Sequence, residues 1–170
     1  MRKKNKKGGV NNIVEDPYNK IDRRFSITSD QLGEGWRPII PEKIKLTDER
    51  PYIYREVKGF ALEDPSMDKL AQLLVVLFDY GDDSVSKDAF REIGKGLESE
   101  MPKVPNIGDE SVVYEMELMH SIRIKVMSFR YRNWLAIFTM WLFKEYDVED
   151  LWVKELMSKQ LERIKGWSAG

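Results

Sequence analysis

The clearest pattern of apolar and β-favouring residues runs from Asn106 to Phe143. Asn106, Gly108 and Asp109 open it and are typical of a turn, because glycine accepts positive φ and Asn and Asp side chains bond nearby backbone. Three runs rich in Val, Ile, Tyr, Phe and Trp follow, with short polar breaks between them. They predict a β-meander with strands over residues 111–118, 122–131 and 134–143. The last run is apolar at almost every position, which indicates a central strand covered on both faces.

Two segments carry helical periodicity instead. Residues 85–101 place apolar side chains three and four positions apart, with Asp83 or Ser84 as the expected cap and Pro102 as the stop. Gly94 and Gly96 weaken this helix and indicate close packing of its backbone, for which the sheet is one candidate. A second helix is predicted over residues 148–165, whose apolar stripe comprises Val153, Leu156, Met157, Leu161 and Ile164.

The chain before these helices is expected to be largely extended. Residues 51–62 read as a strand with neither face cleanly apolar, which suggests an edge strand, and residues 70–80 read as a buried strand. Phe25–Thr28 reads as a short strand or a lead-in segment, and Pro38 and Pro41 favour extended backbone. Residues 1–20 are charged and poor in apolar groups, so they predict a disordered basic arm before a single domain over residues 21–170. The expected fold is α+β, an antiparallel sheet flanked by helices in an α/β/α sandwich.

Composition narrows the class of protein. The chain of 170 residues is long enough for one good core, and its formal net charge of −1 does not indicate bulk attraction to nucleic acid or to an anionic membrane. There is no cysteine, which excludes disulfides, thiolate metal sites and catalytic thiols. High Lys and Glu with little Gln resembles the composition of thermophile proteins.

No run approaches the roughly 18 consecutive apolar residues that a membrane span needs. The basic start of the chain, from Arg2 to Lys7, is followed by polar residues rather than by the apolar segment of a signal peptide. As written, the sequence therefore predicts a cytoplasmic protein, and an extracytoplasmic one if a native signal sequence has been removed.

The order of these features resembles the Mog1/PsbP-like group, which includes small prokaryotic lipoproteins and sensor-type domains. The resemblance covers roughly residues 26–164 and depends on Gly35-Trp36, on the loop Ile107-Gly108-Asp109-Glu110-Ser111 and on Arg130-Tyr131-Arg132-Asn133-Trp134. It implies an antiparallel sheet between helix layers and a binding, assembly or sensor role without conserved enzymatic chemistry. The chain departs from the group because it has no signal sequence and no lipid-attachment cysteine.

Catalytic and metal chemistry have few candidates. His120 is the only histidine, and its neighbour Ser121 would point to the opposite side of an extended chain, so the pair does not form a nucleophile and base. The best metal candidates are Asp79, Asp82 and Asp83, because oxygen-rich loops suit calcium or magnesium. Asp82 and Asp83 also have an ordinary role in turning the chain and capping the following helix. No cofactor is expected.

Two further groups of residues suggest binding. Arg123, Lys125, Arg130 and Arg132 could form a basic sheet face for nucleic acid, although ion pairs with Glu115 and Glu117 on the neighbouring strand are simpler. Aromatic side chains exceed what one small core easily hides, and the candidates for a binding surface are Trp36, Tyr52, Tyr54 and Tyr131. Trp36 is expected to be exposed because it follows a Gly-rich loop.

The leading hypothesis is a non-enzymatic binding or assembly module that takes a protein partner or a small ligand. The alternatives are a metal-dependent hydrolase built on the Asp79–Asp88 loop and a protein that contacts nucleic acid through its basic arm.

Overall fold

The computed structural model describes residues 25–41, 49–95, 97, 102–119 and 121–168. The predicted basic arm and His120 lie outside the described residues. Within them the chain forms, in order, α1 (Ser29–Leu32), β1 (Trp36–Ile39), β2 (Tyr54–Glu63), β3 (Lys69–Asp79), α2 (Asp83–Ile93), β4 (Glu110–Met119), β5 (Ile122–Tyr131), β6 (Trp134–Phe143) and α3 (Asp150–Ser168). None of the helices among these residues is long and apolar enough to cross a membrane.

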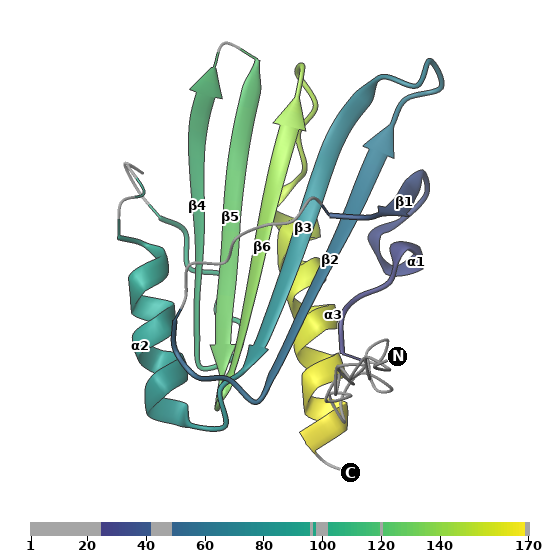
Figure 1. The fold of residues 1–170 in the computed structure, drawn as a ribbon. Helices are drawn as coiled ribbons and strands as arrows, with labels where there is room; N and C mark the ends of the chain where they lie inside the picture. Colours follow the sequence, from purple (N-terminus) through teal and green to yellow (C-terminus); the bar gives the residue numbers. More distant parts are fainter. Residues whose placement is uncertain (1–24, 42–48, 96, 98–101, 120, 169–170) are drawn as a thin grey trace, which may run out of the picture.

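The strands form one antiparallel sheet in the order β1-β2-β3-β6-β5-β4 (Figure 1). The predicted meander is confirmed as β4, β5 and β6, and the apolar last strand lies between β3 and β5, near the centre of the sheet. The prediction of an edge strand over residues 51–62 is wrong for the second half of β2, because β1 pairs with it from Gly59 to Leu62 and leaves Tyr54–Lys58 beyond that pairing. The α+β class with an antiparallel sheet is therefore established.

Helix α3 covers one face of the sheet and carries most of the core. Leu156, Met157 and Ile164 are buried against alternate sheet residues such as Phe138 and Met140. The helix agrees with the predicted apolar stripe, because burying that stripe removes a large apolar area from water.

Phe25–Thr28 serves as a lead-in segment rather than a strand and packs under α3. Phe25 and Ile27 are almost fully buried, and their backbone is held by the buried side chain of Gln160. The Ile27 N–H donates to the Gln160 Oε1 at 3.0 Å, and the Gln160 Nε2 donates to the Phe25 carbonyl. One amide side chain thus forms hydrogen bonds with two buried backbone groups that are not paired in the sheet.

Helix α2 lies against the opposite face of the sheet, where a second and smaller apolar cluster includes Phe78, Ala89 and Leu135. The Asp82 carboxylate caps the helix by accepting from the backbone N–H groups of Ser84 at 2.7 Å and Val85 at 3.1 Å. The predicted helix is present, but its cap is Asp82 rather than the expected Asp83 or Ser84, and it ends at Ile93, earlier than the predicted residue 101. The sheet thus lies between α3 on one face and the shorter α2 on the other.

Candidate functional site: the open sheet face

The early end of α2 leaves part of its sheet face without a covering helix among the described residues. Gly94, the residue that follows the helix, packs directly against the side chain of Tyr114 on β4. Tyr114 pairs with Val126 on β5, which pairs with Thr139 on β6. These three residues lie on one row of the sheet, so the rows beyond them extend past the end of the helix.

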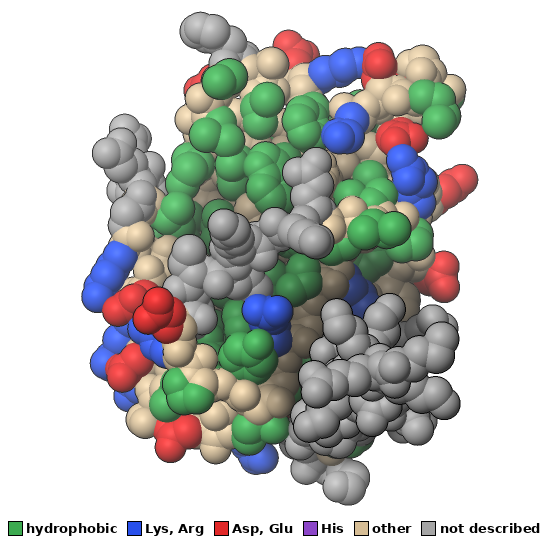
Figure 2. Space-filling model, viewed as in Figure 1, with side chains coloured by type: hydrophobic (Ala, Val, Ile, Leu, Met, Phe, Trp, Pro, Cys, Tyr) green, Lys and Arg blue, Asp and Glu red, His purple; other side chains and the backbone are tan. Residues whose placement is uncertain are grey.

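Apolar side chains fill the uncovered rows. Ile124 lies directly between Met116 on β4 and Trp141 on β6, and Ile122 lies opposite Phe143 in the next row. All five side chains are half-buried rather than buried. We call Met116, Ile122, Ile124, Trp141 and Phe143 the open sheet face. Figure 2 shows hydrophobic side chains gathered over the upper parts of β4, β5 and β6, where these rows lie.

The apolar surface deepens into a groove beside Trp141. The groove has a volume of about 230 Å³ and runs from β6 across β3 to the end of β1. Its lining is apolar except for one amide, and comprises Ile39, Pro41, Gly59, Gln72, Leu73, Leu74, Trp141 and Phe143. Lys69 Nζ lies 5.7 Å from the centre of the Phe143 ring, so a cation lies at the Phe143 end of the groove. The groove is suited to an apolar side chain from a partner.

The aromatic residues predicted to bind do not share a surface. Trp36 is only 9% exposed and stacks on Trp152 of α3, with ring centroids 5.9 Å apart. The expectation that Trp36 is exposed is therefore wrong. Tyr54 is buried on the α3 face, and its hydroxyl donates to the Glu56 carboxylate at 2.8 Å.

The two remaining aromatic candidates lie on opposite faces. Tyr52 is 44% exposed and contacts Phe78 edge-on, on the α2 face. Tyr131 is half-buried against the α3 core, and Arg132 lies over its ring. The structure thus distributes the four aromatic candidates over both faces instead of joining them in one site.

The three aspartates predicted to bind a metal each have another partner. Asp79 Oδ1 accepts from the Gly81 N–H at 2.8 Å and from the Asn133 side chain, Asp82 caps α2, and Asp83 pairs with Arg130. No group of three or more His, Cys, Asp or Glu side chains among the described residues could hold a metal ion. The aspartates therefore act locally, on the turn and on the helix start.

Arg130 is the most connected cation on the α2 face. Its side chain is only 8% exposed, and it donates to Glu110 at 2.8 Å, to Asp83 at 2.5 Å and to the backbone carbonyl of Arg132 at 3.0 Å. Burial alone would lower the pKa of Arg130, but its bonds to Glu110 and Asp83 raise the pKa above the ordinary value. Arg130 therefore ties β5 to β4 and to the start of α2.

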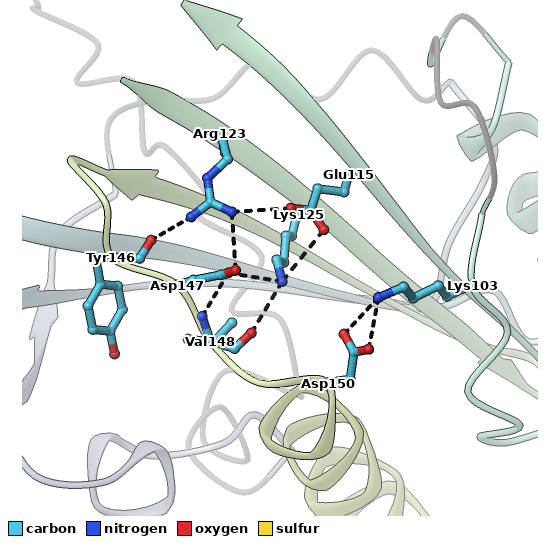
Figure 3. A network of polar contacts seen from close by, with 8 residues as sticks. All are labelled: Lys103, Glu115, Arg123, Lys125, Tyr146, Asp147, Val148 and Asp150. Atoms are coloured by element: carbon cyan, nitrogen blue, oxygen red, sulfur yellow. Dashed lines mark hydrogen bonds and ion pairs between the residues drawn. The ribbon is translucent and has the colours of Figure 1, made fainter. Parts of the chain in front are cut away.

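Arg123 and Lys125 point to the α3 face, so the four basic residues do not form one nucleic-acid surface. The Lys125 side chain is buried and pairs with Asp147 at 3.1 Å and with Glu115 at 3.7 Å (Figure 3). Arg123 pairs with Glu115 at 3.3 Å and with Asp147 at 3.2 Å, and donates to the Tyr146 carbonyl at 2.8 Å. The predicted cross-strand ion pairs are thus confirmed for Glu115, and they also fix the loop before α3.

Asp147 is the centre of this network. Burial would raise its pKa, but the Val148 N–H and the cations of Lys125 and Arg123 outweigh burial and lower the pKa below its ordinary value. Asp150, at the start of α3, pairs with Lys103 at 2.8 Å, which lowers its pKa as well. The network holds structural elements together, because each of its cations pairs with a carboxylate on another element.

The open sheet face was not among the predicted sites. The apolar run over residues 134–143 predicts a strand covered on both faces, but Trp141 is half-exposed because α2 ends before its row. The alternation along β5 is the sequence signal that could have located the open sheet face. Ile122 and Ile124 lie on the same face of the strand as Arg130, but at its opposite end.

Comparisons with known proteins give no relative for this arrangement. No family model matches the chain, no curated protein matches its sequence and no solved structure matches its fold. The site is therefore interpreted from its own residues.

Proposed function

We propose that this protein is a non-enzymatic binding or assembly module of the Mog1/PsbP-like kind, and that it takes a protein partner on the open sheet face. The observation that carries this proposal is the continuous row Met116–Ile124–Trp141, which leads from the edge of the sheet into the groove and is not covered by either helix.

The chemistry of this surface supports a protein partner. Trp and Met are enriched at protein interfaces, since Trp gives a large contact area at low entropy cost and Met adapts its shape. Apolar side chains that remain half-exposed together, rather than singly, are typical of an interaction surface. The groove beside Trp141 provides the pocket in which a central apolar side chain of the partner would be desolvated.

The two alternative functions gain no specific support. A metal-dependent hydrolase would need Asp79, Asp82 and Asp83 to converge, and each is engaged separately. A nucleic-acid contact through the strand residues would need Arg123 and Arg130 on one face, and they lie on opposite faces. We therefore place both behind the binding module.

The test is capture of the full-length protein with its partners from the native host, read by native mass spectrometry. Ile124→Lys places a charge in the middle of the open sheet face, and Leu151→Lys places the same charge at an exposed apolar residue on α3. We expect a stoichiometric partner that Ile124→Lys loses and Leu151→Lys keeps. Equal capture by both variants, or a lone monomer from the wild-type chain, would contradict the proposal.

A further inference from the structure

The hydrogen bonds of Val113 show which residues of β4 direct their backbone N–H and C=O groups away from β5. Lys103 and Val113 form an isolated antiparallel bridge, in which the Lys103 N–H donates to the Val113 carbonyl at 3.0 Å and the Val113 N–H donates to the Lys103 carbonyl at 2.8 Å. Val113 therefore directs both of its backbone groups away from β5. Because this direction alternates along an antiparallel strand, Glu115 and Glu117 also direct their N–H and C=O groups outward.

Unlike the groups of Val113, the outward groups of Glu115 and Glu117 have no strand partner among the described residues. The bridge at Val113 is the outermost pairing of β4 there, and the strand continues to Met119 with only β5 beside it (Figure 1). Leu118 and Met119 are 54% and 72% exposed. In the part of the chain that the structure describes, this half of β4 thus presents an unpaired edge, which is a template for a further strand.

The side chains along the edge differ between its two faces. Glu115 and Glu117 lie on the α3 face and are exposed, whereas Met116 lies on the open sheet face. Arg123 is opposite Glu117 in register, but its guanidinium contacts Glu115, Asp147 and the Tyr146 carbonyl. A strand added here would place one set of alternate side chains beside the two carboxylates and the other set beside Met116.

The other edge of the sheet has different chemistry. β1 pairs with β2 only from Gly59 to Leu62, so Tyr54–Lys58 extends beyond it. That part of β2 exposes the cation of Arg55, and the Glu56 carboxylate is buried and paired with Lys58 at 2.9 Å. A basic strand would be repelled by Arg55 and would find no exposed carboxylate like Glu117.

We infer that the β4 edge from Glu115 to Glu117 binds an extended partner segment in which basic and apolar residues alternate. A basic residue of the segment lies opposite Glu117, whereas Glu115 already pairs with Arg123 and Lys125, and the apolar residues extend the row of Met116 and Ile124. Backbone hydrogen bonds supply affinity, and the Glu117 carboxylate selects the sequence. The inference rests on the proposed function, because the segment is the part of the same protein partner that reaches the edge of the open sheet face.

The probe is a capped, fluorescent eight-residue peptide of alternating lysine and valine, titrated with the full-length protein by fluorescence anisotropy. Its controls are a glutamate–valine peptide of the same pattern and the lysine–valine peptide with alternate backbone nitrogens methylated. We expect saturable binding of the first peptide and at least about tenfold weaker binding of both controls, because each removes either charge complementarity or strand pairing.

Variants of the protein locate the site. Glu117→Lys is expected to weaken peptide binding at least about tenfold, and Glu117→Gln is expected to weaken it less. Glu155→Lys makes the same charge change at an exposed position on α3 and should leave peptide binding unchanged. The Gln variant is nearly isosteric, so a weakening by it cannot be assigned to misfolding. Absent binding, equal binding of both charge patterns, or equal weakening by Glu117→Lys and Glu155→Lys would overturn the inference.

The experiments can contradict one of the two proposals without contradicting the other. If Ile124→Lys abolishes capture of the native partner but the lysine–valine peptide does not bind, the edge inference is wrong and the open sheet face remains. If the peptide binds through Glu117 while Ile124→Lys captures the partner normally, the open sheet face is wrong and the edge remains.

Discussion

Gly94 lies so close to Tyr114 that a Cβ built on the glycine would stand 2.1 Å from the tyrosine Oη. The end of α2 is therefore packed onto β4 at a position that accepts no side chain without movement. The row of Tyr114 marks how far α2 extends over the sheet face, and the open sheet face begins in the next row, at Met116.

Gly94→Ala is expected to lower the free energy of unfolding by about 1–2 kcal/mol, because an added methyl group in a tight contact forces its neighbour to shift. Gly166→Ala is the matched control, since Gly166 lies in α3 with open space around its Cβ position. That change should raise stability by up to about 1 kcal/mol through helix propensity. Urea unfolding of both variants measures the difference, and a neutral or stabilising Gly94→Ala would show that Tyr114 moves freely.

Trp36→Ala is expected to lower the free energy of unfolding by about 3 kcal/mol, because it removes a buried indole that stacks on Trp152. Trp167 is 40% exposed near the end of α3, and Trp167→Ala should cost clearly less. Equilibrium unfolding followed by circular dichroism gives both values. A Trp36→Ala protein as stable as the wild type would contradict the burial of Trp36 against Trp152.

Arg130→Leu is expected to lower the free energy of unfolding by about 2 kcal/mol, because Asp83 and Glu110 lose charged hydrogen bonds that join α2, β4 and β5. Arg37→Leu removes an exposed pair with Glu63 and should change stability by about 0.5 kcal/mol or less. Thermal melts under identical buffer conditions compare the two. Similar losses in both variants would mean that burial adds nothing to the Arg130 network.

Asp147 makes the stability of the folded protein depend on pH in the acid range. Its pKa is lowered in the folded state, so its contribution to stability is complete above the unfolded value near 3.8 and is lost as the pH falls through the lower folded value. Asp147→Asn should therefore destabilise the protein at neutral pH, and the difference from wild type should shrink below about pH 4. High salt at neutral pH should shrink it only in part, since Lys125 is buried. A difference that stays constant with pH would contradict this assignment.

The sheet and α3 could be predicted because their signals are local. The meander has strand periodicity interrupted by turn residues, and the stripe from Val153 to Ile164 repeats at helical spacing, so each element agrees with its own sequence. The short strand β1 could not be predicted in this way. It contains Pro38 and pairs over four residues, and its place depends on β2 lying beside it.

The candidate site could not be predicted for the same kind of reason. Trp36 follows a Gly-rich loop, which indicates exposure, but Trp152 covers it from a helix far along the chain. Trp141 belongs to an apolar strand, which indicates burial, but its face is covered only as far as α2 extends. In both residues the exposure is decided by long-range packing, and the sequence nearby contains no information about it.

The most direct measurement of the binding surface is photo-crosslinking in the native host. A photoreactive side chain is placed at residue 116, at the edge of the open sheet face, or at residue 151, on the opposite side of the sheet. We expect a discrete adduct with one protein partner from the Met116 position and none from the Leu151 position. An adduct of equal yield from both positions, or one from Leu151 alone, would contradict the assignment of the open sheet face as the place where this module binds.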